Sequence, residues 1–233
     1  MRADILSALD AESRSRHGSI LVTDLESGAQ RLVRDDAIGD DPLAPQLAAQ
    51  LRLGKSALIE TPGGNVFLRV RVPKLRLMLL GAVHIAQALV PMARLANYDV
   101  TVIDPRSAFA TPERFPDCEI IAEWPQAVFA AQPLDRYTAM IVLSHIPDID
   151  DAGIKAALAG ECFYIGALGS RKTQAKRLER LRAENISEAA LARIHAPVGL
   201  DIGAVSAAEI AIAILAEVIA ARRQKPLRSE QAA

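Results

Sequence analysis

Two glycine turns carry the residues best suited to binding an anion. The first contains Gly81 and His84 and follows an apolar run at residues 75–80. The second follows the apolar run 162–168 and contains the candidates Gly169, Ser170, Arg171 and Lys172. Each turn leads into a segment with helical spacing, so it offers the free N–H groups and the positive dipole end of a helix. Cations at a helix N-terminus are disfavoured unless an anion accompanies them, so the second turn favours a phosphate or oxyanion.

Other polar candidates follow further apolar runs. Asp104 ends the run 100–103 and is followed by Arg106, and an acid at this position of a dinucleotide-binding unit accepts hydrogen bonds from ribose hydroxyls. The remaining candidate ligand contacts are Ser144 and His145 after the run 139–143, Asp150, and His195 and Asp201 in a loop at 195–203. Asp150 or its neighbour Asp151 is expected to cap a helix that runs to about residue 159.

A doubly wound parallel α/β sheet would bring these candidates together. Strand 75–80, glycine turn, helix 85–95 and strand 100–103 form the opening unit of such a Rossmann-like fold. Further strands are expected at 119–122, 139–143 and 162–168, and a final helix at 207–223. Since the carboxyl ends of parallel strands share one edge, four polar turns should gather there into a pocket for a phosphorylated, anionic small molecule.

The N-terminal third has the pattern of a small α+β domain. A short helix, a hairpin around residues 26–28, a helix at 45–53 and two strands flanking the turn 61–65 are expected. We place this domain at residues 1–73 and the Rossmann-like domain at 74–225. Residues 226–233 are expected to form a disordered tail.

The first turn departs from a dinucleotide fingerprint. Gly81, Val83 and Ala86 stand where that fingerprint has three glycines, and the Val83 side chain should obstruct a pyrophosphate. An NAD(P)-dependent oxidoreductase therefore stays open as an alternative, supported by Asp104 and opposed by Val83. Neither a GxSxG nucleophile nor a metal motif is present, so the chemistry indicated is binding. The cations Lys176, Arg177, Arg180 and Arg182 are expected to form a solvated helix face.

Composition narrows the class of protein. The chain has 233 residues, is 51% hydrophobic and 4% aromatic, and carries a net charge of -1, which argues against a nucleic-acid partner or a polybasic membrane protein. Met1 leads into a charged segment with no apolar core of a signal peptide, so we expect a cytoplasmic protein with no membrane partner. The two cysteines, Cys118 and Cys162, lack metal-ligand spacing, and Cys162 is expected to be a buried apolar residue.

Five segments resemble the xanthine dehydrogenase accessory factors (XdhC/CoxI family). They are GAVHIAQAL, DPRSAFATPERFP, SHIPDID, FYIGALGSRKT and IHAPVGLDIGA, in this order within residues 75–223. The resemblance implies a protein that binds molybdenum cofactor (molybdopterin) and protects it while a cysteine desulfurase helps to install its sulfido ligand. It also implies that the cofactor is handed to a molybdenum hydroxylase such as xanthine dehydrogenase, and it suggests a homodimer.

Carried over by position, the resemblance points to the same candidates as the turns. The cofactor contacts it implies are Gly81, His84, Asp104, Arg106, His145, Gly169, Ser170, Arg171 and Lys172, with His84 and Arg171 foremost. Many relatives carry a cysteine-containing N-terminal segment, whereas no cysteine precedes Cys118 in this chain. A cysteine contact to molybdenum or sulfur from the N-terminal domain is therefore missing. A non-catalytic assembly scaffold for the hydroxylase is the third alternative.

Overall fold

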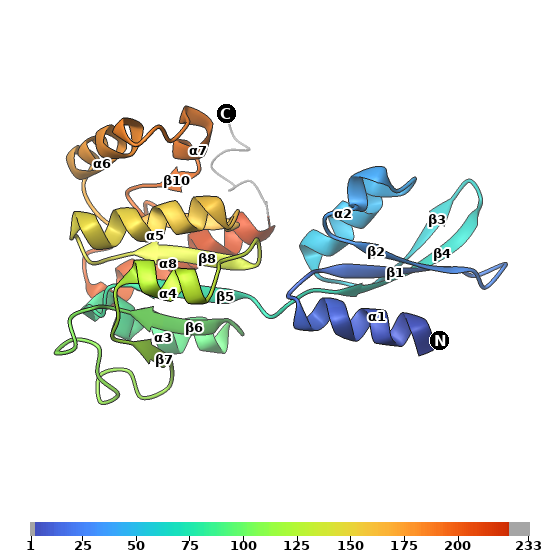
Figure 1. Cartoon of the computed structure of the whole chain (residues 1–233), viewed down its shortest axis with the longest axis horizontal. Helices are drawn as coiled ribbons and strands as arrows, with labels where there is room; N and C mark the ends of the chain where they lie inside the picture. The colour runs from blue at the N-terminus through green and yellow to red at the C-terminus, as the bar shows by residue number, and fades with distance from the viewer. Residues whose placement is uncertain (1–2, 224–233) are drawn as a thin grey trace. The chain divides into compact units, whose positions relative to one another are not determined.

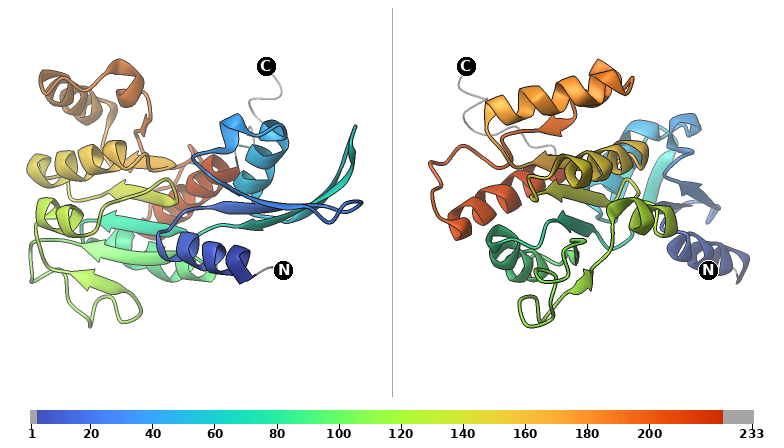
Figure 2. Two further views of the ribbon diagram at one scale, coloured as in Figure 1. Left: turned by 45° about the vertical axis from the view of Figure 1, so that its right-hand side comes forward. Right: turned by 60° about the vertical axis from the view of Figure 1, so that its left-hand side comes forward.

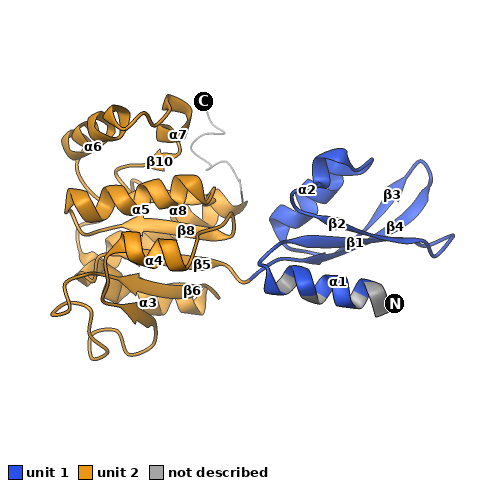
Figure 3. Ribbon diagram, in the orientation of Figure 1, with its two compact units in different colours: residues 1–73 blue, residues 74–233 orange. Residues whose placement is uncertain are grey.

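The structure, a computed structural model, describes residues 3–223 (Figure 1; further views in Figure 2). The chain divides into two compact units, residues 1–73 and 74–233 (Figure 3). The tail expected at residues 226–233 lies outside the described residues.

Unit 1 is built on a four-stranded antiparallel sheet with the order β2-β1-β4-β3. Its elements are α1 (Ala3–Arg14), β1 (Ser19–Asp24), β2 (Gln30–Arg34), the 3-10 turn η1 (Ile38–Asp40), α2 (Ala44–Leu53), β3 (Ala57–Thr61) and β4 (Gly64–Arg71). Figure 1 shows α1 and α2 on opposite faces of this sheet. Leu47 of α2 is fully buried against Ile20 and Leu68, which the alternation of strand side chains directs to the same face. Both expected hairpins are present.

Unit 2 is built on a six-stranded parallel sheet with the order β10-β9-β8-β5-β6-β7. The strands are β5 (Arg76–Leu80), β6 (Asp99–Ile103), β7 (Glu119–Ile121), β8 (Thr138–Val142), β9 (Tyr164–Ala167) and β10 (Ile194–His195). The chain runs outward from β5 to β6 and β7, then returns to β8 on the other side of β5. The predicted doubly wound α/β fold with a smaller α+β part is therefore confirmed.

Helices cover both faces of the parallel sheet. They are α3 (His84–Leu95), α4 (Pro125–Ala131), α5 (Pro147–Ala159), α6 (Arg171–Ala183), α7 (Glu188–Leu191) and α8 (Ala207–Arg223). Leu77 and Leu79 of β5 pack with α3 and α8, whereas Met78 and Leu80 pack with α4, α5 and α6. Burial on both faces explains why β5 has an uninterrupted apolar sequence.

Two local predictions were wrong. Helix α5 begins at Pro147, with Ile146 as its N-cap, so Asp150 and Asp151 lie inside the helix and do not cap it. Proline is well suited to a first helical turn, because its missing N–H would have no partner there. His195, expected in a loop, instead lies with Ile194 in the edge strand β10 beside β9.

Helix α8 is the longest helix between residues 3 and 223, and Glu209 and Glu217 interrupt its apolar sequence. Within that same range, every helix is too short or too polar to cross a bilayer.

Candidate functional site

The carboxyl ends of β5 and β8 form the switch point of the parallel sheet. These strands are neighbours, but their connections run in opposite directions, and ligands of doubly wound folds bind at such a point. Gly81 follows β5 with φ +118°, and a Cβ atom there would lie 2.8 Å from the Ser144 backbone nitrogen after β8. The sequence needs glycine here because the two turns approach so closely.

Asp104 fastens the first glycine turn to the loop after β6. Its carboxylate accepts hydrogen bonds from the Ala82 amide at 2.8 Å and from Arg106 Nε and Nη2 at 2.9 and 2.7 Å. Burial disfavours the charged form of Asp104, but these hydrogen bonds outweigh it and hold its pKa below the ordinary value. Both oxygens are engaged, so a ribose hydroxyl would have to compete with Arg106.

The loop that follows Asp104 is ordered by two arginines around one aromatic ring. The guanidinium carbons of Arg106 and Arg114 lie 4.5 and 5.6 Å from the centroid of Phe109. Arg114 also donates to the Phe109 carbonyl and to the Gln87 side chain of α3, at 2.8 and 3.1 Å. Even with both guanidinium groups against it, Phe109 is 43% exposed.

His84 is the first residue of α3 and is exposed. The N-cap position before it is Val83, whose side chain has no acceptor for the first amides of the helix. His84 is therefore exposed at this turn, and its contact to a ligand stays a prediction.

A buried charge pair joins the turn after β8 to α6. Ser144 donates from its hydroxyl and its amide to Asp150 Oδ1, at 2.7 and 3.3 Å. Arg177 Nη2 of α6 lies 3.5 Å from Asp150 Oδ2, and the two side chains are 2% and 3% exposed. Burial raises the pKa of Asp150, against the hydrogen bonds from Ser144 and the charge of Arg177.

Arg177 is the site residue that the sequence did not indicate. It was expected on a solvated helix face, which is wrong, because α6 packs this side chain over Asp150 and the Leu168 carbonyl. Its Nη1 donates to Gln174 at 2.8 Å, while its buried Nε has no hydrogen-bond partner among the described residues. Arg180 is also tied, in a two-bond ion pair with Asp151 at 2.6 and 3.0 Å.

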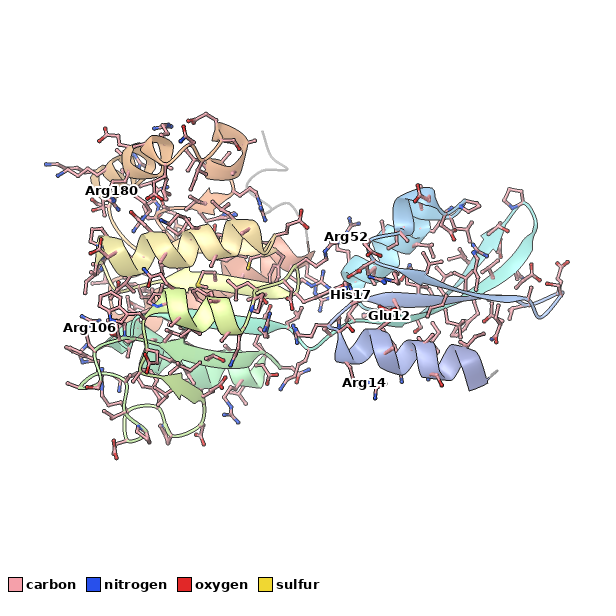
Figure 4. The ribbon with its side chains drawn as sticks, in the orientation of Figure 1. Glu12, Arg14, His17, Arg52, Arg106 and Arg180 are labelled. Atoms are coloured by element: carbon pink, nitrogen blue, oxygen red, sulfur yellow. The ribbon has the colours of Figure 1, made fainter. Side chains whose placement is uncertain are left out.

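A pocket of about 250 Å³ lies at the beginning of α6. Its cationic lining residues are Lys172, Lys176, Arg177 and Arg180, and the others are His145, Pro147, Asp150 and Thr173. Ser170 caps α6 by accepting a hydrogen bond from the Thr173 amide at 3.2 Å. Figure 4 shows Arg180 on α6 and Arg106 after β6 on the same side of unit 2. The cations and the helix N-terminus together give this pocket the groups that bind anions in proteins.

The structure brings some of the predicted residues together and separates others. His145, Asp150 and Lys172 line the pocket, and Ser144 is bonded to Asp150. Gly169, Ser170 and Arg171 are the residues leading into α6. Asp201 is exposed in the last loop, and His195 is engaged elsewhere.

His195 belongs to a network centred on Glu217 of α8. Glu217 accepts hydrogen bonds from the Tyr164 hydroxyl at 2.5 Å and the Gly199 amide at 2.6 Å, and His195 Nδ1 lies 2.8 Å from its other oxygen. Burial opposes the charged form of Glu217, but these partners hold its pKa below the ordinary value. The network fastens the 195–200 segment to α8.

Replacing Glu217 by alanine should lower the free energy of unfolding by about 1–3 kcal/mol, because the Tyr164 hydroxyl and the Gly199 amide lose their acceptor. Chemical denaturation measures this loss. Glu188→Ala is the control, since its ion pair with Arg182 is exposed and should contribute little. Equal losses in the two variants would contradict a structural role for the Glu217 network.

Neither cysteine has the properties of a reactive thiol. Burial raises the pKa of Cys118 to about 11 and that of Cys162 to about 12. Since the thiolate is the nucleophile, both side chains are poor sulfur carriers, and Cys162 is buried as predicted.

We therefore expect iodoacetamide to alkylate both thiols at least about a hundredfold more slowly in the native protein than in denaturant. Mass spectrometry of timed samples gives the two rates. Rapid native labelling of either cysteine would contradict the raised pKa values.

Two larger hollows lie elsewhere in unit 2. One of about 520 Å³ lies between α4, α5 and α6, and four of its charged residues form two ion pairs, Lys155 with Glu184 and Arg180 with Asp151. One of about 420 Å³ lies at the amino-terminal ends of β5 and β6. The smaller pocket is the one at the carboxyl edge that holds a buried donor without a partner among the described residues.

Comparison with known proteins identifies relatives of this chain. The family pattern of the XdhC Rossmann domain matches residues 77–218. YqeB of Escherichia coli, an uncharacterized protein, is 32% identical over 75% of this chain and 33% of its own length. A probable xanthine dehydrogenase component of Bacillus subtilis is 32% identical over 69% of this chain and 47% of its own. The molybdenum cofactor insertion chaperone PaoD of Escherichia coli is 31% identical over 64% and 41%.

A solved structure resembles the whole chain. The crystal structure of a xanthine dehydrogenase from Bacillus halodurans superposes with a TM-score of 0.66 and 25% identity, over 99% of this chain and 69% of the other. The chain spans between a third and a half of the length of the curated relatives it matches.

Proposed function

This chain belongs to the XdhC family, and we propose that it is an accessory protein that binds molybdenum cofactor and assists its insertion into a xanthine dehydrogenase-type hydroxylase. The observation that carries the proposal is the cation-lined pocket at the carboxyl edge of an XdhC Rossmann domain. The names of two relatives, a cofactor insertion chaperone and a probable xanthine dehydrogenase component, support the same assignment.

The residues present fit the phosphate end of molybdopterin. Arg177 offers a buried N–H donor without a partner among the described residues, and Lys172 and Lys176 add exposed cations at the start of α6. Charged donors and a helix N-terminus are the groups that bind phosphate most strongly. When bound, the molybdenum centre supplies the oxidation chemistry of the receiving hydroxylase, and this chain would contribute binding and protection. We propose His84 and Arg171 as contacts for the parts of the cofactor outside the pocket.

The proposed role is holding the cofactor rather than carrying sulfur. A sulfur carrier needs a thiolate at neutral pH, and burial raises the pKa of both thiols in this chain. We propose that a cysteine desulfurase would supply the sulfur directly to the cofactor held on this chain.

The proposal can be tested by cofactor transfer. The purified chain, loaded anaerobically with molybdenum cofactor, is mixed with a xanthine dehydrogenase that lacks the cofactor, and the recovered hydroxylase activity is measured. We expect faster recovery than with free cofactor alone, and slower recovery when Lys172→Gln replaces the native chain. Lys155→Gln, an exposed charge change outside the pocket, is the matched control. Equal recovery with and without the chain would refute the accessory role.

A further inference from the structure

We infer that the pocket at the start of α6 binds a single phosphate monoester, and that Asp150 makes it select an oxyanion that can carry a proton over sulfate. This inference rests on the proposed function, since the molybdenum cofactor is the phosphate monoester expected there. Free phosphate shares the same chemistry, and the experiment below separates the two sources.

The size of the pocket limits the ligand to one small group. Its volume is about 250 Å³, whereas pockets that enclose a drug-sized ligand measure roughly 300–1,000 Å³. A tetrahedral oxyanion fits such a space, and the remainder of a larger molecule would extend outside it. The pocket therefore recognises the end of the cofactor and not its ring system.

The charges around the pocket favour an anion. Its four cations outnumber the two carboxylates, Asp150 and Asp151, that pair with them. The N-terminus of the 13-residue helix α6 adds its partial positive charge. The strongest indication is Arg177, which is 2% exposed and has one buried N–H without a partner in the described part of the chain. Leaving a buried donor unpaired costs free energy, and a ligand oxygen that displaced the side chains covering this N–H would recover it.

Asp150 is the residue that would distinguish between oxyanions. Its Oδ1 already accepts two hydrogen bonds from Ser144, but its Oδ2 lies at the 3.5 Å limit from Arg177 and keeps most of its capacity to accept. The other titratable groups near Asp150 are Arg106, His145, Asp151, Lys172, Lys176 and Arg180. An ionised carboxylate accepts a hydrogen bond from a protonated phosphate oxygen, whereas sulfate carries no proton at neutral pH and is repelled.

Isothermal titration of the full chain tests the inference with inorganic phosphate, glycerol 3-phosphate and sulfate as probes. At about pH 6, close to the second pKa of a phosphate monoester, both phosphates still carry a proton and sulfate does not, so we expect both phosphates to bind at least about tenfold more tightly than sulfate. Equal affinities for phosphate and sulfate would overturn the selectivity. If neither phosphate binds, the pocket is not a phosphate site and the inference is overturned.

Variants locate the binding. Lys172→Gln with Lys176→Gln, both at exposed positions, should weaken phosphate binding by about tenfold, and Lys155→Gln should leave it unchanged. Asp150→Asn should bring the phosphate and sulfate affinities to within about threefold. Circular dichroism checks that Asp150→Asn folds. If it does not fold, the lysine variants and the ratio of phosphate to sulfate affinity of the native chain still test the inference. An unchanged affinity in the double lysine variant would overturn the assignment.

Competition separates this inference from the proposed function. Excess glycerol 3-phosphate should displace molybdenum cofactor from the native chain under anaerobic conditions. Cofactor binding that neither the phosphate nor the lysine variants weaken would refute the inference and leave the accessory function standing. Binding of both phosphates without any binding of cofactor would leave the pocket standing and refute the accessory function.

Discussion

Gly81→Ala is expected to lower the free energy of unfolding of the chain by about 2–5 kcal/mol. The φ angle of +118° is a strained region for alanine, and the added Cβ would lie 2.8 and 3.0 Å from the Ser144 backbone N and Cα. Both atoms belong to the backbone of the turn that follows β8, so neither can move without disturbing the sheet edge. Chemical denaturation monitored by circular dichroism measures the loss.

Gly203→Ala is the matched control for the close approach. Gly203 also has a positive φ, +73°, but a Cβ atom there would meet nothing within 4 Å. The control isolates the cost of the backbone angle, about 1 kcal/mol. Similar losses in the two variants would show that the contact between the two turns does not matter for stability.

Asp150→Ala is expected to cost about 3–5 kcal/mol, because it removes the only carboxylate bonded to the buried Arg177 among the described residues. A guanidinium cannot lose its proton, so the charge would remain buried without compensation. Arg177→Met should cost less, because the Asp150 carboxyl left behind can take up a proton. Denaturation of both variants under the same conditions measures this asymmetry. Equal costs, or a smaller cost for Asp150→Ala, would contradict the burial of this pair.

The same pair predicts the direction of a pH effect. Burial raises the pKa of Asp150 in the folded state above its unfolded value. Its contribution to stability is therefore complete below the ordinary carboxyl pKa and is lost as the pH rises through the raised folded value. Arg177→Met should enlarge this loss, since the neighbouring positive charge no longer favours the ionised form. Asp150→Ala should abolish it, and a pH profile unchanged by Asp150→Ala would contradict the assignment.

Much of the fold could be predicted because short segments of the sequence indicate its elements. The apolar run before Gly81, the helical spacing after it and Asp104 at the end of the next strand define a doubly wound unit without any distant contact. The seven-residue helix α4 was not anticipated, because so short a segment lacks a clear period. Pro147 was a better indication of the start of α5 than the acidic residues after it.

The site was less predictable than the fold, because burial of a charge depends on a partner far along the chain. Arg177 is 27 residues from Asp150, and α6 carries cations around most of its surface. Its buried face could not be read from hydrophobic spacing. The sequence did carry one indication of a cationic site. Lys172, Lys176 and Arg180 recur at four-residue intervals and so share a helix face. The sequence placed Asp104 at the end of a strand, but only the structure shows that its carboxylate is paired with Arg106.

The most direct test of the central claim is equilibrium binding of molybdenum cofactor to the purified chain under anaerobic conditions, with NAD and NADP titrated in parallel. Arg171→Ala and Lys172→Gln probe the start of α6, and Lys155→Gln is the control for a change of charge. We expect the chain to bind the cofactor, Arg171→Ala and Lys172→Gln to weaken that binding, Lys155→Gln to leave it unchanged, and neither dinucleotide to bind. Binding of a dinucleotide without binding of the cofactor would contradict the proposed function and would point to the first glycine turn as a nucleotide site.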